Sequence, residues 1–231
     1  MNYWKKQRYL NLIKENWSVT NLFLAIQIMV FVLMTVMGGS ENSYTLIRFG
    51  AKVNILVATG EYWRLVTPIF IHIGLAHIVM NSLFLYYLGN EIERTLGSGR
   101  FFIIYLLSGI MGNVTSFAFS NALSAGASTS LFGLFGVILY LAYKHSYVRS
   151  FQYLGKVYGP LIVMNIIFGF LDSGVDNFGH LGGLLGGFLV TAMVSFRGDR
   201  NTSVVERIVA VIAYGAIFII LFRLGVAKVV Y

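Results

Sequence analysis

A cluster of hydroxyl residues stands among small residues at the start of a long apolar stretch. Ser128, Thr129 and Ser130 directly follow Gly126-Ala127. A serine hydroxyl is a weak nucleophile until an adjacent base takes its proton. The small residues before Ser128 would let another segment approach it closely, so we identify Ser128 as a candidate nucleophile. Thr129 and Ser130 have the more common explanation of packing residues in an apolar helix.

Polar residues near the start of two other apolar stretches could supply the remaining chemistry. His180 could take the proton of Ser128 and return it to a leaving amine. His77 and Asn81 are four residues apart and would share one face of a helix. Together with the backbone N–H of Ser128, they could stabilise an oxyanion. His72 lies more than a turn above His77 and is expected nearer to water. Each residue alone would more often be hydrogen-bonded structure or part of a proton relay.

Other kinds of catalytic site have less support in the sequence. Asp172 and Asp176 lie in a short loop before His180 and have no obvious place beside its ring, so we expect a Ser–His dyad and not a triad. His72 and His77 could bind a metal, but no third ligand has a suitable spacing and the sequence has no H-E-x-x-H motif. We therefore predict neither a metal nor a cofactor. The chain has no cysteine, which excludes disulfides and cysteine catalysis.

The composition is that of an integral membrane protein. Of the 231 residues, 57% are hydrophobic and 11% are charged, and the mean hydropathy is +0.75, whereas soluble domains have about 25% charged residues. The apolar stretches are continuous and not alternating, which favours helices over barrel strands. We predict an all-α membrane protein, a polytopic helical bundle of seven spans of which the fourth and fifth are short. The spans are expected at about residues 19–37, 72–88, 101–119, 126–143, 157–171, 178–195 and 204–224.

The distribution of Lys and Arg predicts how the chain is oriented in the membrane. With a cytoplasmic N-terminus, twelve of the 17 Lys and Arg residues lie on the cytoplasmic side and five on the other, as the positive-inside rule requires. Topology thus explains the net charge of +8, and we expect no nucleic-acid partner. The second, fourth and sixth spans would all begin on the outer side, which places His77, Ser128 and His180 at similar depth. Polar groups inside a bilayer are functional candidates.

Glycine spacing predicts that the fourth and sixth spans pack closely against each other. The sixth span carries a stripe of glycines, and the fourth span has a face of small residues. The stripe consists of Gly179, Gly183 and Gly187, and the face of Gly126, Ser130 and Gly133. Small residues allow two helix backbones to approach closely. We expect this crossing to bring Ser128 within hydrogen-bond reach of His180.

Taken together, these residues resemble the rhomboid family of intramembrane serine proteases. The resemblance covers about residues 60–190 and depends on several short motifs in a fixed order. The motifs are Trp63-Arg64, the pattern H-x4-H-x3-N formed by His72, His77 and Asn81, Gly89-x3-Glu93-x3-Gly97, Gly126-Ala127-Ser128, and His180-x2-Gly183-x3-Gly187. The residue after the serine is often glycine in this family and is Thr129 here.

The resemblance implies a domain plan and a location. A rhomboid-like core of six helices would occupy residues 19–195, after a cytoplasmic segment at 1–18. Residues 196–231 would form a cytoplasmic loop and a seventh helix. The protein would be integral to a membrane, with a bacterial plasma membrane as the expected location, its N-terminus in the cytoplasm and its active site open to the outside.

The resemblance also implies a role for each site residue. Ser128 matches the nucleophile, His180 the general base, and His77 and Asn81 the oxyanion stabilisers. Phe132 matches an aromatic residue that packs on the catalytic imidazole. The remaining residues expected to support the site or the substrate are Gly126, His72, Trp63 and Arg64.

The activity that the resemblance implies is the cleavage of transmembrane segments of other membrane proteins by a Ser–His dyad. A substrate helix must unwind locally before the serine can attack, so helix-breaking residues near the cut and a small residue before it are expected. Substrates would arrive from the bilayer through the fifth span and under the loop at 172–177. Two alternatives remain open: a transporter or channel that uses the intramembrane His and Asn residues, and a catalytically inactive rhomboid-like chaperone.

Overall fold

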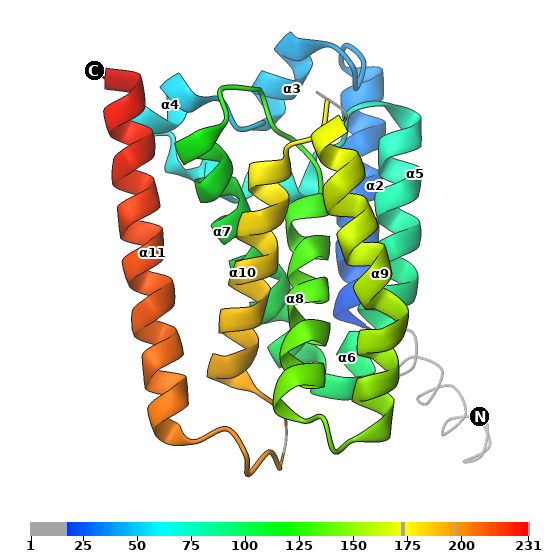
Figure 1. Cartoon of the computed structure of the whole chain (residues 1–231). Helices are drawn as coiled ribbons and strands as arrows, with labels where there is room; N and C mark the ends of the chain where they lie inside the picture. The colour runs from blue at the N-terminus through cyan, green and yellow to red at the C-terminus, as the bar shows by residue number, and fades with distance from the viewer. Residues whose placement is uncertain (1–17, 172–173, 197, 231) are drawn as a thin grey trace, which may run out of the picture.

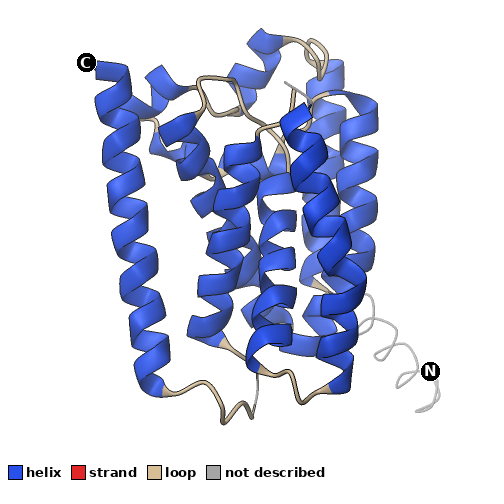
Figure 2. Cartoon of the chain, viewed as in Figure 1, coloured by secondary structure: helices blue, strands red, loops and turns tan. Residues whose placement is uncertain are grey.

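A computed structural model describes residues 18–171, 174–196 and 198–230, and within them the predicted all-α bundle is confirmed (Figure 2). The expected cytoplasmic segment therefore lies, except for Ser18, outside the described residues. In chain order the helices are α2 (Val19–Val36), α3 (Ser43–Phe49), α4 (Asn54–Ala58), η1 (Tyr62–Leu65), η2 (Thr67–Phe70), α5 (Gly74–Phe84), η3 (Leu85–Gly89), α6 (Asn90–Leu96), α7 (Ser98–Phe119), α8 (Ser128–Lys144), α9 (Arg149–Leu171), α10 (Asn177–Val194) and α11 (Val204–Val230).

Helix lengths agree with most of the expected spans and correct two of them. Five described helices, α2, α7, α9, α10 and α11, are long and apolar enough to cross a membrane. Helix α8 has 17 residues and is short, as expected. The prediction of a short fifth span was wrong, because α9 begins at Arg149 and has 23 residues. Its first turns are polar, so the apolar stretch in the sequence did not include them. The second expected span starts at Gly74 and not at His72, and η3 continues it as a π-helical segment.

Helix α8 lies in the middle of the bundle, with α7 and α10 beside it (Figure 1). Helices α5 and α9 stand on one side of this centre and α11 on the other. Helices α5, α8 and α10 all begin at the end of the bundle that carries α3 and α4, which is the parallel arrangement predicted from the parity of the spans. Most residues of α8 are buried, so its first turn is well placed to be enclosed by neighbouring helices.

The crossing of α8 and α10 is a contact between backbones. A Cβ atom added to Gly183 would lie 2.0 Å from the carbonyl oxygen of Thr129, and one added to Gly187 would lie 2.0 Å from that of Gly133. A Cβ on Gly136 would meet the carbonyl oxygen of Leu184 at 2.2 Å. The glycine stripe predicted on the sixth span therefore does allow close packing, as small residues do at other helix crossings.

The matching face on the fourth span was assigned partly to the wrong residues. Gly133 does face α10, but Ser130 faces α7, where a Cβ on Gly109 would lie 2.2 Å from the Ser130 hydroxyl. Gly126 precedes the helix and approaches His77 on α5. The error arose because an apolar helix buried on all sides gives no signal of which face meets which neighbour. Thr129 takes the place expected for these residues, and its methyl group fits against the glycine at 179.

Two buried charged residues fix the ends of the bundle. Arg64, in the connection before α5, donates hydrogen bonds to the carbonyl oxygens of Ile47 at 2.8 Å and Ala51 at 3.0 Å, and its guanidinium lies 4.3 Å from the ring centre of Trp63. At the other end, Glu93 of α6 accepts hydrogen bonds from the first backbone N–H groups of α2. A carboxylate at a helix N-terminus stabilises that helix.

Candidate active site

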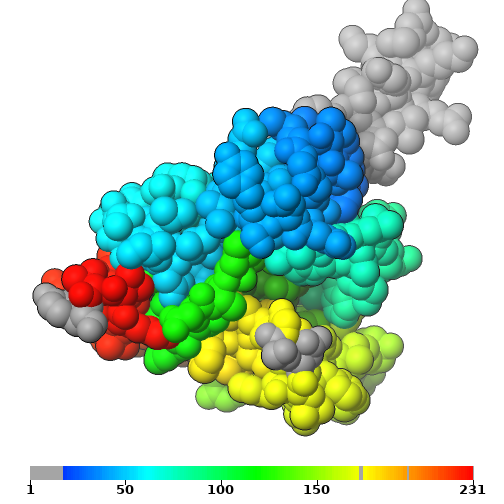
Figure 3. Space-filling model, turned by 90° about the horizontal axis from the view of Figure 1, so that it is seen from above, coloured from blue at the N-terminus to red at the C-terminus, as the bar shows by residue number. Residues whose placement is uncertain are grey.

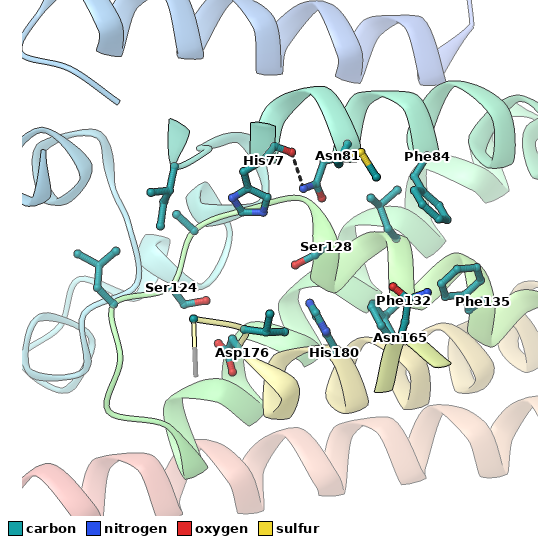
Figure 4. Close-up of a pocket in the computed structure, with 17 residues that line it drawn as sticks. His77, Asn81, Phe84, Ser124, Ser128, Phe132, Phe135, Asn165, Asp176 and His180 are labelled. Carbon is teal, nitrogen blue, oxygen red and sulfur yellow. Dashed lines mark hydrogen bonds between the residues drawn. The ribbon is translucent and has the colours of Figure 1, made fainter. Parts of the chain in front are cut away.

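A cavity of about 540 Å³ opens at the end of the bundle where α5, α8 and α10 begin. Figure 4 shows the side chains of His77, Asn81, Ser128 and His180 pointing into it from three helices. In the view from above, the surface is hollowed between α5 and the yellow segment that leads into α10 (Figure 3). His77 and His180, which are 103 positions apart in the sequence, thus line the same cavity. Phe132 and Asp176 also line it.

The segment before Ser128 is held by backbone hydrogen bonds from two directions. Gly126 N–H donates to the carbonyl of Pro68 at 2.9 Å, and Ala127 N–H donates to Nε2 of His72 at 3.3 Å. Lys52 and Ser124 exchange two backbone hydrogen bonds further back in the same segment. Helix α8 then starts at Ser128, whose side chain is half-buried. These contacts fix the height and direction at which the hydroxyl meets the cavity.

Gly126 has a conformation and a neighbour that both require glycine. Its φ of +140° is one that side chains rarely adopt. A Cβ atom there would lie 2.7 Å from Cε1 and 2.8 Å from Nε2 of His77. The absence of a side chain at Gly126 therefore lets the His77 ring lie directly beside the segment that leads to Ser128.

His180 stands in the first turn of α10, and stacking fixes its ring. The ring centres of His180 and Phe132 are 4.0 Å apart and their planes differ by 9°. Nδ1 of His180 is buried and has no hydrogen-bond partner among the described residues. The orientation of this imidazole thus depends on the aromatic contact with Phe132 of α8, which is the contact that the resemblance implied.

Asn81 and His77 form one polar surface on α5. Asn81 Nδ2 donates to the backbone oxygen of His77 at 2.9 Å, which leaves one amide hydrogen for another acceptor (Figure 4). The His77 ring packs edge-to-face on that of His72, with ring centres 5.3 Å apart. Two potential donors therefore face the cavity opposite His180.

Comparison with known proteins now identifies the family. A model of the Rhomboid domain matches residues 59–197. The chain belongs to the rhomboid family. It is 49% identical over 177 residues to rhomboid protease GluP of Bacillus subtilis (strain 168), a match that covers 76% of this chain and 34% of GluP. With its apolar helices, this rhomboid is an integral membrane protein.

Two further relatives cover more of their own length. The putative rhomboid protease YdcA of Bacillus subtilis (strain 168) is 34% identical over 150 residues, which are 64% of this chain and 75% of YdcA. Rhomboid-like protease 1 of Toxoplasma gondii is 33% identical over 195 residues, 79% of this chain and 67% of that protein. This rhomboid thus spans about a third of GluP and about two thirds or more of the other two relatives.

The structure of this rhomboid corrects the expected position of His72. His72 was expected nearer to water, but it is fully buried. Residues 71–73 are not helical, so His72 does not stand above His77 on a continued helix and instead folds inward beneath the segment before Ser128. Because its Nε2 accepts the Ala127 N–H, the ring proton of neutral His72 is on Nδ1. His72 supports both His77 and the segment before the serine.

Two residues near the cavity were missed from the sequence. Asp176, which had no obvious place beside His180, lines the same cavity and caps α10. Its spacing of four residues from His180 was the available signal. Lys52 is fully buried, and its ammonium donates to Asn54 Oδ1 at 3.0 Å. Burial lowers the pKa of Lys52 to about 8, while the nearby charge of Asp176 acts in the opposite direction. Nothing in the local sequence indicated that this lysine would be buried.

Proposed function

We propose that this rhomboid is an intramembrane serine endopeptidase that cleaves transmembrane segments of other membrane proteins with a Ser128–His180 dyad. One observation carries the proposal: Ser128, His180, His77 and Asn81 line a single cavity, although they come from three different helices. The relatives are named a rhomboid protease, a putative rhomboid protease and a rhomboid-like protease, and these names support the same reaction class. No metal or cofactor takes part in the proposed reaction.

In the proposed mechanism, His180 takes the proton of Ser128 as Oγ attacks the carbonyl carbon of the substrate. The carbonyl oxygen becomes an oxyanion, which Asn81 Nδ2, the His77 ring and the N–H of Ser128 stabilise in a site of low dielectric. When the C–N bond breaks, His180 gives its proton to the leaving amine. A water molecule, activated by the same imidazole, then hydrolyses the acyl-enzyme and regenerates the hydroxyl of Ser128.

The proposed substrate is a helix that loses its regular structure near the cut. Backbone carbonyls within a helix are already hydrogen-bonded, so local unwinding must precede attack. Helix α9 forms one wall beside the cavity. In its most apolar stretch of 18 residues only 17% of the residues are buried, whereas the corresponding stretch of α7 is 72% buried. We propose that substrates arrive from the bilayer past α9. The proposed orientation has a cytoplasmic N-terminus and a cavity open to the outside of a bacterial cell. The proposed domains are a core at 19–195 and, at 196–231, a cytoplasmic loop with the seventh helix.

Labelling with a fluorophosphonate tests the proposal without a known substrate. The purified protein in detergent is treated with the probe, and the modified peptide is mapped by mass spectrometry. We expect the label on Ser128 and its loss in the Ser128→Ala and His180→Ala variants. Ser130→Ala is the matched control, because Ser130 lies on the same helix but faces α7. A label elsewhere, or equal labelling of Ser128→Ala, would overturn the proposal.

A cleavage assay in liposomes separates the proposal from its two alternatives. A tagged model transmembrane protein is reconstituted with wild type, Ser128→Ala or His180→Ala protein. The proposed endopeptidase cuts this protein only when both residues are intact. A chaperone would bind it with the same affinity in all three cases and leave it whole, and a transporter would neither cut nor retain it.

A further inference from the structure

We propose that Asp176 is a positioning residue for His180, and that its negative charge stabilises the imidazolium that forms when His180 takes the proton of Ser128. The positional part rests on contacts alone, whereas the part about Ser128 rests on the proposed function. Asp176 was expected to have no place beside His180, and the dyad needs no third hydrogen-bonding member. The geometry gives this carboxylate a different role.

The carboxylate of Asp176 fixes the start of α10 against α7. Its Oδ1 accepts the backbone N–H of Gly179 at 3.0 Å, and its backbone oxygen accepts the N–H of His180 at 3.1 Å. Its Oδ2 accepts a hydrogen bond from the hydroxyl of Ser116 on α7. An aspartate at this position is a strong N-cap. Asp176 therefore determines where the first turn of α10 begins, and with it the direction in which the side chain of His180 projects from the helix.

The charge of Asp176 acts at a place where a cation would otherwise be disfavoured. The N-terminus of a helix carries a partial positive charge, and His180 lies in the first turn of α10. An imidazolium there would face this positive end without compensation. Figure 4 shows Asp176 between Ser124 and His180 at the edge of the cavity. Of the described groups, Asp176 at the N-cap of α10 and His77 on α5 are those whose charges act on His180.

Lys52 is a buried cation whose charge interacts with that of Asp176. Its ammonium is held by Asn54 Oδ1 and by the carbonyl of Ser120 at 3.4 Å, beyond the C-terminal end of α7. The charges of Lys52 and Asp176 interact. The charge of Asp176 therefore acts on Lys52 as well as on His180.

Asp176 does not act as the hydrogen-bonding member of a triad. Its oxygens are already engaged by Gly179 and Ser116, and within the described part of the chain Nδ1 of His180 has no hydrogen-bond partner. The ring is oriented by stacking on Phe132. The effect of Asp176 on the imidazole is therefore through its charge and through the helix start that it fixes.

The test compares the removal of the charge with the removal of one hydrogen bond. Asp176→Asn keeps a side-chain acceptor for the cap but loses the charge, and Asp176→Ser is a second uncharged cap in case Asn folds poorly. Ser116→Ala is the matched control, because it removes a hydrogen bond from the same carboxylate and keeps the charge. The rate of fluorophosphonate labelling of Ser128 is measured as a function of pH for each protein.

We expect Asp176→Asn to lower the maximal labelling rate by about tenfold and to move the acid limb of the profile to lower pH by about one unit, since one pH unit corresponds to a factor of ten. Ser116→Ala should stay within about threefold of wild type, with the limb unmoved. The charge assignment is overturned if the limb of Asp176→Asn stays in place, or if Ser116→Ala moves it equally.

A second measurement keeps the inference independent of the proposed function. The chain has four histidines, so the ring signals of isotope-labelled histidine can be assigned with single substitutions in detergent. The titration midpoint of His180 should move to lower pH in Asp176→Asn and remain in place in Ser116→Ala. If wild type is not labelled at Ser128, the proposed function fails, and this titration alone decides the role of Asp176: an unchanged midpoint overturns it.

Discussion

The substitution Gly126→Ala should damage the site far more than it damages the fold. The φ of +140° at Gly126 makes any other residue strained, at roughly 1–3 kcal/mol. The new Cβ would in addition lie 2.7 Å from the His77 ring, where ordinary contacts begin at 3.4 Å. The ring or the segment before Ser128 must therefore shift by about 0.7 Å. A displacement of about 1 Å in a catalytic group can reduce a rate by about 100-fold.

Gly60→Ala separates the strain from the contact. Gly60 has a φ of +114°, and no described atom lies within 4 Å of its added Cβ. Both variants should lose similar thermal stability in detergent, but labelling of Ser128 should fall about 10- to 100-fold in Gly126→Ala and stay within about threefold in Gly60→Ala. In a His77→Ala background, Gly126→Ala should cause little further loss of labelling, because the clashing ring is gone. Equal labelling losses in the two glycine variants, or fully additive losses in the double variant, would refute the reasoning.

Three further predictions concern stacking, packing and charge. Phe132→Ala should slow labelling of Ser128 about fivefold, because it removes the stacking on His180, and contacts of this kind contribute about 1 kcal/mol. Phe132→Tyr should keep the wild-type labelling rate. Gly187→Ala should lower the free energy of unfolding by about 3 kcal/mol because its Cβ meets the α8 backbone. The free energy of unfolding of wild type should increase as pH rises above about 8, where folded Lys52 loses its proton while unfolded Lys52 still holds it. The increase is at most about 1.4 kcal/mol per pH unit. Lys52→Met should not show this increase.

Each of these predictions has a clear contrary result. For the stacking, Phe132→Tyr as slow as Phe132→Ala would show that an aromatic ring at this position is not sufficient. For the packing, the control is Gly215→Ala, where no described atom lies within 4 Å of the new Cβ; a stability loss as large there as at Gly187 would contradict the crossing. For the charge, equal pH dependence of melting in wild type and Lys52→Met would exclude a lowered pKa.

The spans and the residues brought to the cavity could be predicted because both depend on local patterns. A continuous apolar stretch identifies a spanning helix whatever its neighbours are, and parity then decides which helices begin at the same end. This reasoning was sufficient to place His77, Ser128 and His180 together. It did not extend to α9, whose first turns are polar and thus resemble a loop in hydropathy.

The missed features depend on contacts between distant parts of the chain. The place of Asp176 follows from Ser116, which is 60 residues away, and the burial of Lys52 follows from its contact with the end of α7. His72 turned inward because the helix begins two residues after it. The face of Ser130 was unpredictable because α8 is apolar and buried all round. In each case the sequence gives the residue type, and only tertiary packing gives its partner.

The backbone crossing of α8 and α10 also limits where the selectivity of this protein can be redesigned. No rotamer change can widen a contact made of main-chain atoms, so substitutions there would disturb folding before they altered the substrate choice of the proposed endopeptidase. The cavity walls formed by Met80 and Phe84 on α5 and by Asn165 on α9 are different, because their side chains can be exchanged without touching that crossing. Libraries that seek new preferences of the proposed endopeptidase should therefore vary these two walls and leave the central helix pair unaltered.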